Sequence, residues 1–348
     1  MSNIFDMAEN TLLTIILPTF NRCDFLDEML RNLLPQVSEK AEKVRVFVSD
    51  NASTDNTQQV IDKYLNLYPH ILGSHRQESN LGAQANFQDA VKRVNSKYVA
   101  LIGDDDVLSP WYLDVAIMLL EKFPNAVLFN FNVICANYSF ANGFLRQKNI
   151  SGLLPVVYEN GADFIYDHLS IPSLISSNIF DRKGFISHIG DFAKETYPGY
   201  DWLAILYFSC VDKQCIFYGY PLIIQRYPAF QRWGNNGPWF HIYGLGRLFH
   251  DLDKKHSGLF NHWIDYSHST NRNMLEDMLP IVYANKGVYQ SRYKMMKPYL
   301  GPKRYARKFW LHLYLSPLYV SFLHHPLTIV CNKIKADINR MINIFKHD

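Results

Sequence analysis

The chain has 348 residues, of which 48% are hydrophobic and 19% charged, and this composition excludes a globally disordered protein. The formal net charge of +3 is close to neutrality, so the overall charge predicts no nucleic acid partner. The five cysteines show no CxxC spacing, which excludes the common zinc and dithiol motifs.

Residues 10–135 alternate between short apolar runs and segments with helical spacing. The strands predicted in this region are 12–17, 44–48, 71–75, 98–102 and 126–133. The predicted helices are 25–34, 57–68, 83–94 and 110–120, with Pro18 ending the first strand and Pro35 following the first helix. This alternation predicts an α/β fold of Rossmann type, with a mostly parallel sheet flanked by helices.

Three of these strands end in polar clusters. Asp50 follows the second strand, Asn80-Leu81-Gly82 follows the third, and Gly103-Asp104-Asp105-Asp106 follows the fourth. Ligands of parallel α/β sheets bind beyond the carboxyl ends of the strands. We therefore expect a binding site at this edge of the sheet.

The acidic run Asp104–Asp106 is the strongest candidate metal site. Adjacent carboxylates repel one another and require a counter-cation or full solvation. Because a buried strand precedes them, we expect them to hold Mg²⁺ or Mn²⁺, which is usually shared with substrate phosphates. The alternative is a solvated loop whose last aspartate caps the following helix.

Other residues at the strand ends are suited to a nucleotide. Asp50 can accept the imide N–H of uracil or thymine, or it can serve a turn, although Asp55 already suits the helix cap. In Pro18-Thr19-Phe20-Asn21-Arg22, Phe20 can stack on a base or join the core, and Arg22 can pair with phosphate or lie on the surface. Gly82 permits close backbone approach, and Asn86 is either near this ligand or a surface amide.

Together, these four motifs resemble family 2 glycosyltransferases in order and spacing, over roughly residues 10–135. Ser49-Asp50-Asn51-Ala52-Ser53 and Gly103-Asp104-Asp105-Asp106 are also similar to bacterial surface-polysaccharide members, including abequosyltransferase-like proteins. The resemblance implies a GT-A fold and inversion at the sugar carbon. It implies that Asp50 binds the donor base, that Asp104 lies near the ribose and metal, and that Asp105 is the main metal ligand. Gly103 departs from the usual Asp-X-Asp-Asp pattern.

An inverting transfer also requires a general base for the acceptor hydroxyl. The family places an acid before a helix in the second half, and Asp201 in Tyr197-Pro198-Gly199-Tyr200-Asp201-Trp202 matches, with Glu195 as the alternate. A helix cap is the other interpretation of Asp201. Arg232 is a candidate phosphate contact, and His241 is a candidate further metal ligand or a structural histidine.

We predict three regions. Residues 10–135 form the donor half, 136–245 the acceptor-binding and catalytic half, and 246–348 a helical, basic and aromatic extension. The apolar stretch 309–331 is interrupted by His312, Pro317 and Pro326, so we expect it to lie in an anionic membrane interface rather than span it. The alternative is packing on the catalytic domain or a dimer partner in a homo-oligomer.

The expected partners are a nucleotide-sugar donor and a glycan or lipid-linked oligosaccharide acceptor. Asp6 and Glu9 in residues 1–10 do not suit a signal peptide, so we expect a cytoplasmic protein at the inner face of the membrane. A dinucleotide oxidoreductase would need GxGxxG after the first strand, which Pro18–Arg22 lacks. A nucleotidyltransferase and an inactive nucleotide-binding scaffold remain as alternatives.

Overall fold

The computed structural model describes residues 11–137, 143–145, 154–169, 174–193, 196–227, 236–269, 282 and 285–301. The chain divides into two compact units. Unit 1 comprises residues 1–234 and 244–263, and unit 2 comprises 235–243 and 264–348. The strands of the sheet all belong to unit 1.

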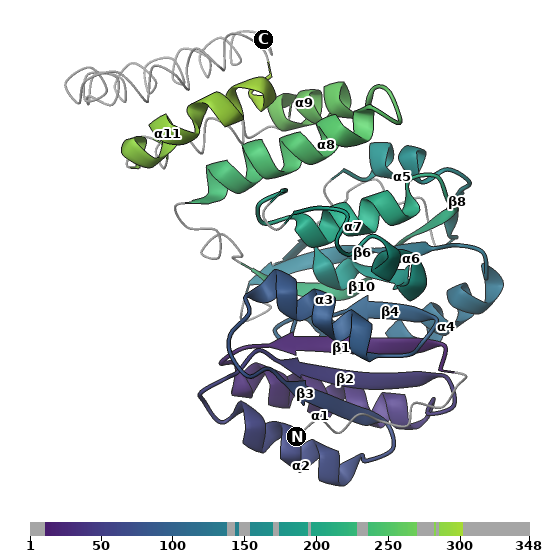
Figure 1. Cartoon of the computed structure of the whole chain (residues 1–348). Coiled ribbons are helices and arrows are strands. Elements are labelled where there is room, and N and C mark those ends of the chain that lie inside the picture. The colour runs from purple at the N-terminus through teal and green to yellow at the C-terminus, as the bar shows by residue number, and fades with distance from the viewer. Residues whose placement is uncertain are drawn as a thin grey trace, which may run out of the picture. The chain divides into compact units, whose positions relative to one another are not determined.

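Ten strands form one sheet in the described part of unit 1, in the order β3-β2-β1-β4-β9-β6-β10-β5, with β7 beside β6 and β8 beside β10 (Figure 1). Four strands from the first part of the chain run parallel: β1 (Leu13–Thr19), β2 (Val44–Asp50), β3 (Leu72–Arg76) and β4 (Tyr98–Leu101). Parallel strands joined by helices bury both faces of the sheet, which accounts for the continuous apolar runs in their sequences.

The remaining strands make the sheet mixed. β9 (Asn178–Asp181) runs antiparallel to both β4 and β6 (Leu128–Asn137), and β10 (Cys215–Tyr227) runs parallel to β6. The short strands are all antiparallel to their neighbours: β5 (Val107–Leu108), β7 (Gly143–Leu145) and β8 (Val156–Tyr158). The predicted mostly parallel α/β sheet is therefore confirmed for the first half of the chain.

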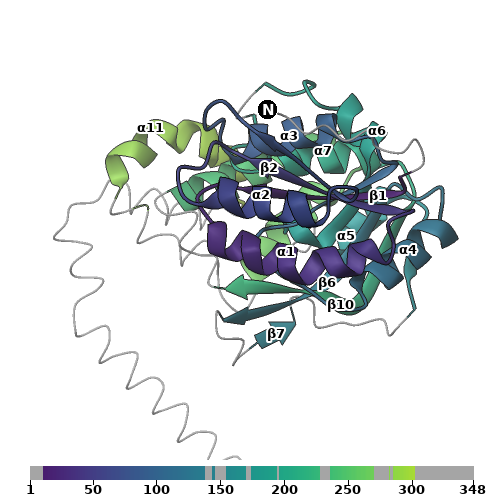
Figure 2. The same cartoon turned by 90° about the horizontal axis from the view of Figure 1, so that it is seen from below.

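Helices cover both faces of this sheet. Figure 2 shows α1 (Cys23–Ser38) and α4 (Tyr112–Lys122) on one side and α3 (Ala83–Arg93) on the other. The remaining helices are α2 (Thr57–Leu67), α5 (Gly161–Asp167), α6 (Arg182–Ser187), α7 (Asp201–Cys210), α8 (Gly246–Asp253), α9 (Leu259–Ser269) and α11 (Lys286–Met296). The predicted helical C-terminal region is thus present.

The core between β1 and α1 shows why the first element pair forms. Ile15 and Leu17 of β1 belong to one apolar cluster with Leu26 and Leu30 of α1, and all four side chains are fully buried. Burying one such side chain contributes about 1.5–3 kcal/mol relative to exposure. This apolar packing fixes α1, whose amino-terminal end follows the carboxyl end of β1.

Two predicted element ends are wrong because proline does not interrupt either element. Pro18 pairs in register with Ser49, so β1 continues to Thr19. The first helix includes Pro35 and runs to Ser38. Pro35 is exposed while Val37 is fully buried, so apolar burial beyond the proline compensates for the missing backbone hydrogen bond.

Within the described residues, no helix has both the length and the apolar character needed to cross a membrane. The predicted interfacial segment 309–331 lies outside the described residues. Its contact with a membrane or a partner subunit therefore stays a prediction.

Candidate functional site

The site residues predicted at the ends of the first strands lie at one edge of the sheet because three strand ends are in register. Thr19 of β1 lies beside Asp50 of β2, and Asp50 lies beside Arg76 of β3. The hydroxyl of Thr19 donates a hydrogen bond of 2.8 Å to Oδ2 of Asp104. The structure therefore joins the end of β2 to the acidic run after β4 through a single residue of β1.

The acidic run is buried, contrary to the alternative of a solvated loop. The residues Asp104, Asp105 and Asp106 are only 4%, 3% and 7% exposed. Nη1 of Arg22 lies 2.9 Å from Oδ1 of Asp104 and 3.2 Å from Oδ2 of Asp105. One guanidinium thus faces two buried carboxylates.

The pKa values of this cluster reflect burial and pairing together. Burial raises the pKa of the Asp104 carboxyl, and the charge of Arg22 and the Thr19 hydrogen bond only partly oppose it. Burial alone would lower the pKa of Arg22, but the charges of Asp104 and Asp105 outweigh it and the pKa is raised. Arg22 is therefore cationic at any physiological pH and acts as the counter-ion of the run.

Gly103 has a steric role at the start of this run. A Cβ atom at this position would lie 3.2 Å from both Oδ1 of Asp105 and Oδ2 of Asp106. The departure from the family pattern therefore leaves room for these two carboxylates beside the backbone. Ser176, in the short helix Ile175–Ser177, adds a hydroxyl that accepts from the Gly103 N–H at 2.9 Å and donates to Asp106.

The residues of the run fit a divalent cation by ligand chemistry and charge. All their donors are carboxylate oxygens, and Arg22 supplies one positive charge against three acids. Across the described ranges, no group of three or more His, Cys, Asp or Glu side chains is arranged to hold a metal ion. Mg²⁺ and similar ions commonly use one or two carboxylates and complete their shell with substrate phosphates and water.

Replacing Arg22 by Met should lower the free energy of unfolding by about 3 kcal/mol, because it leaves buried carboxylates without their counter-ion. Mn²⁺ alone should then raise the melting temperature of the variant more than that of the wild type. Thermal unfolding with Mn²⁺ and with a chelator measures both effects. Arg31→Met, at an exposed position of α1, is the matched control and should change neither value. An equal Mn²⁺ response in Arg22→Met and wild type would contradict this role.

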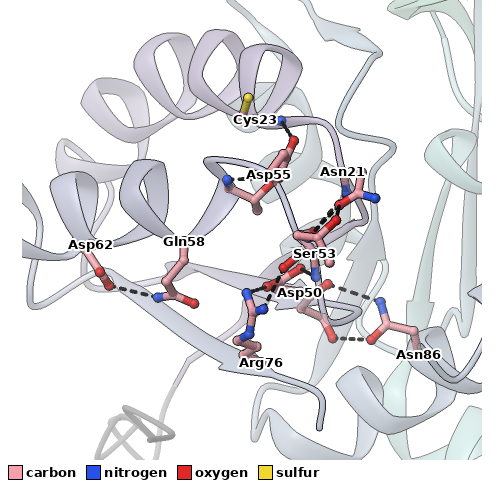
Figure 3. Close-up of polar contacts among 12 residues, drawn as sticks. Asn21, Cys23, Asp50, Ser53, Asp55, Gln58, Asp62, Arg76 and Asn86 are labelled. Carbon is pink, nitrogen blue, oxygen red and sulfur yellow. Dashed lines mark hydrogen bonds and ion pairs between the residues drawn. The ribbon is translucent and has the colours of Figure 1, made fainter. Parts of the chain in front are cut away.

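Asp50 is fully buried and already has two hydrogen-bond partners. Its Oδ2 accepts from Nη1 of Arg76 at 2.8 Å, and its Oδ1 accepts from the Ser53 N–H at 2.9 Å (Figure 3). A carboxylate offers about four lone-pair sites, so these two bonds leave acceptor capacity for a further N–H. Asp55, not Asp50, accepts from Thr57 N at 3.0 Å at the start of α2, as predicted.

The loop after β2 is tied to the loop after β1. Oδ1 of Asn21 accepts from Thr54 N at 2.7 Å, and the Ser53 hydroxyl accepts from Asn21 N at 2.9 Å (Figure 3). Asn21 and Ala52 both have positive φ angles, of 53° and 64°. Such a conformation is rare for alanine and costs of order 1 kcal/mol or more, and it is found most often at functional sites.

The third loop is held by asparagine side chains. Oδ1 of Asn80 accepts from Nδ2 of Asn51 at 2.9 Å and from Gly82 N at 2.8 Å. Gly82 has φ of 80°, which explains the glycine, and a Cβ there would meet no atom within 4 Å. Asn86 is not a surface amide: it is 2% exposed and bonds Ser49 with both ends of its amide. Its contact with the ligand stays a prediction.

The remaining residues of the first motif lie at the surface of the site. Phe20 is 39% exposed, so it is not a core residue, and stacking on a base stays a prediction. Pro18 is half-buried within β1. Arg76 and Ser176 were missed in the sequence because no local pattern separates them from ordinary surface residues; only strand register and tertiary packing bring them here.

Asp201 is the first residue of α7 and is 8% exposed. Its Oδ1 accepts from the backbone N–H of Tyr197 at 2.8 Å. The carboxylate thus bonds backwards into the preceding loop, and the helix has no side-chain cap at Tyr200. A general-base role stays a prediction, and the alternate Glu195 lies outside the described residues.

Two further candidates are not joined to this site by the structure. Arg232 lies outside the described residues. His241 belongs to unit 2, where burial lowers its pKa to about 4. The imidazole is therefore neutral at pH 7, the state needed for metal binding, but its role as a ligand stays a prediction.

Comparison with known proteins shows which protein family this part of the chain resembles. Residues 14–169 match the family model described as glycosyl transferase family 2. This span contains the three strand-end loops and the whole acidic run. Residues 14–169 are therefore similar to glycosyl transferase family 2, and the resemblance predicted from the four motifs is confirmed.

Two curated relatives each match less than a third of the chain. Abequosyltransferase RfbV of Salmonella typhimurium is 35% identical over 98 residues, which are 28% of this chain and 29% of that protein. The poly(ribitol-phosphate) beta-glucosyltransferase of Bacillus spizizenii is 26% identical over 105 residues, 29% of this chain and 16% of that protein. The chain thus matches less than a third of the length of either relative.

Solved structures show the same fold over most of the chain. S. aureus TarS 1–349, in complex with UDP-GlcNAc, gives a TM-score of 0.62 at 16% identity and covers 85% of this chain and 83% of that one. The mannosyltransferase PcManGT of Pyrobaculum calidifontis, in complex with GDP-Man and Mn²⁺, gives 0.51 at 15% identity, over 96% and 90%. The predicted GT-A-like fold is confirmed.

Proposed function

We propose that this protein is an inverting glycosyltransferase that moves a sugar from a nucleoside diphosphate donor to a glycan or lipid-linked oligosaccharide. The observation that carries the proposal is the buried acidic run, which meets Asp50 and Arg22 at the carboxyl edge of a family 2 domain. A purely structural cluster would not need three consecutive buried acids, of which Arg22 pairs with only two, because burying charge costs several kcal/mol for each ion.

The donor end of the site follows from the strand register. Asp50 would accept the imide N–H of a uracil or thymine base through the lone pairs that Arg76 and Ser53 leave available. Phe20 is exposed beside this edge and offers a ring face to the base. A UDP or dTDP donor matches this acceptor group better than a CDP donor, because cytosine lacks the imide N–H.

Asp105 and Asp104 would hold the divalent cation, which when bound neutralises charge on the departing nucleoside diphosphate. Arg22 would then turn from these carboxylates towards phosphate oxygens, since its side chain is about one third exposed at 34%. Thr19 keeps Asp104 in place through its hydroxyl throughout.

Asp201 would take the proton from the acceptor hydroxyl as it attacks the sugar carbon. Its carboxylate is held at the start of α7 by Tyr197 N, and the positive end of a helix favours its ionised form. An ionised, buried and oriented carboxylate is the state that a general base requires. The bond to the diphosphate breaks as the new glycosidic bond forms, which inverts the configuration.

A role in bacterial surface polysaccharide synthesis is supported by the relatives. One is named an abequosyltransferase and another a poly(ribitol-phosphate) glucosyltransferase. A lipid-linked acceptor would require the protein to work at a membrane surface. From residue 278 to 336 the sequence contains no Asp or Glu, whereas it contains ten Lys and Arg residues, eight of them in 286–308 and two in 333–335. In α11, Val288 and Met295 are about half exposed, at 49% and 47%.

The full chain should therefore bind anionic vesicles through the basic residues of 278–336. Lys294 and Lys297 are both exposed, and each basic residue near an anionic surface contributes about 1 kcal/mol. The double variant Lys294→Glu/Lys297→Glu should reduce co-sedimentation with phosphatidylglycerol vesicles by at least about tenfold. Lys92→Glu/Lys122→Glu makes the same change in net charge at exposed positions elsewhere and should bind as wild type. Equal loss in both double variants would indicate only a general charge effect.

The enzymatic proposal is tested first by thermal unfolding of the full chain with nucleotides and nucleotide sugars, in Mn²⁺ or in chelator. Binding to the folded state at 100 times the Kd adds about 2.7 kcal/mol to stability. We expect one nucleoside diphosphate to raise the melting temperature only with metal. A response to nucleoside triphosphates and sugar phosphates instead would favour a nucleotidyltransferase. No response to any nucleotide with Mn²⁺ present would favour the inactive scaffold.

A further inference from the structure

Gln84, in the first turn of α3, contacts the loop that carries Asp201. Its Oε1 accepts from the backbone N–H of Trp202 at 2.9 Å, and its Nε2 donates to the carbonyl oxygen of Gly199 at 3.3 Å. The two backbone groups lie on either side of Asp201 in the sequence. Only one orientation of the amide satisfies both contacts, since one partner is a donor and the other an acceptor.

The contact with Trp202 has a clear structural reason. The first four N–H groups of a helix have no partner within the helix. α7 begins at Asp201 without a side-chain cap, so Gln84 supplies from a different helix the acceptor that a capping residue would normally provide. Gly199 has φ of 77°, which lets its carbonyl turn back towards α3.

Further contacts hold the loop before α7 in place. A Cβ on Gly244 would lie 2.4 Å from the carbonyl oxygen of Pro198, so the backbone there approaches too closely for any side chain. The Tyr197 hydroxyl donates to Asp251 at 3.0 Å, and Tyr197 N donates to Asp201. Gln84 thus ties this loop to α3 through two hydrogen bonds.

α3 is also tied to the donor end of the site. Asn86, two residues after Gln84, bonds the side chain and carbonyl of Ser49, the residue before Asp50. One helix therefore holds the strand end of Asp50 through Asn86 and the loop of Asp201 through Gln84. Since α3 is a single rigid element, it fixes the spacing between these two ends.

We propose that Gln84 is a positioning residue that holds Asp201 at the correct distance from the bound donor. This inference rests on the proposed glycosyltransferase function. Gln84 does not touch the reacting atoms; it acts through the backbone on both sides of the general base. Misplacement of a catalytic group by about 1 Å can reduce turnover by about 100-fold.

The test compares Gln84→Ala with Gln88→Ala in the full chain. Gln88 lies one turn further along α3 and is also partly buried, so it is a matched control. We expect Gln84→Ala to reduce kcat by about 10- to 100-fold, with the donor KM within about twofold of wild type. Amide hydrogen exchange of residues 197–203 should accelerate by about tenfold in this variant alone.

Gln84→Glu separates positioning from folding. Its carboxylate still accepts from Trp202 N but cannot donate to Gly199, and its negative charge should move the acidic limb of the kcat–pH profile to higher pH. Unchanged exchange at 197–203, or an unchanged kcat in Gln84→Ala, would overturn the proposal. If the wild type transfers no sugar from any donor, the glycosyltransferase function fails, while hydrogen exchange still decides whether Gln84 holds the loop.

Discussion

Asp201→Asn should reduce kcat for sugar transfer by about 100- to 10,000-fold, the usual contribution of a general base. The variant is informative because the asparagine carbonyl oxygen can still accept the hydrogen bond from Tyr197 N that Oδ1 of Asp201 accepts now at 2.8 Å. The loop should therefore keep its place, and only the capacity to take a proton is lost. Steady-state kinetics with the donor identified by thermal unfolding measures the change.

Donor binding and stability are the controls for this experiment. The metal-dependent thermal shift with nucleoside diphosphate should be the same in Asp201→Asn and wild type, because Asp201 is not placed among the donor contacts. Asp191→Asn, at an exposed position in the same region, should retain full activity. A kcat within about fivefold of wild type in Asp201→Asn would exclude Asp201 as the general base and favour the alternate, Glu195.

The sequence predicted the strands in the first half of the chain because strands buried on both faces of a parallel sheet have continuous apolar sequences. Apolar runs 12–17 and 98–102 correspond to β1 and β4 with errors of one or two residues at their ends. The two-residue strand β5 was missed because a pair of residues carries no periodicity. The helix through Pro35 was cut short because local propensity cannot include the burial of Val37, which is a tertiary contact.

The acidic candidates were found because carboxylates at buried strand ends are unusual in any context. Their partners were not found, since Arg76, Ser176 and Gln84 reach the site only through strand register and helix packing. Asp50 shows the limit most clearly. The sequence assigned the helix cap to Asp55, which does accept from Thr57 N–H, although the cap position of α2 is Asn56. The sequence did not show that Arg76 already pairs with Asp50.

Asp105→Asn should abolish the metal-dependent response to nucleotide and reduce transfer by about 100-fold or more, while leaving the folded protein as stable or slightly more stable without metal. The loss follows from removing a charged ligand of the cation, whose stabilisation of the leaving group is worth several kcal/mol. The gain follows from the removal of one of three mutually repelling buried acids. Arg22 would still be paired with Asp104 at 2.9 Å.

Thermal unfolding with Mn²⁺, with chelator and with the responding nucleotide measures both effects in one series. The matched control is Asp114→Asn on α4, whose side chain is 63% exposed and pairs with Lys40 at the surface; it should change stability by no more than about 0.5 kcal/mol and leave the metal response intact. The essential result is loss of the metal response without loss of stability, because replacing a buried carboxylate that serves folding alone should destabilise the protein. If Asp105→Asn keeps the metal response and is clearly destabilised, the acidic run is a structural cluster, and Arg22 rather than a metal ion is its permanent counter-ion.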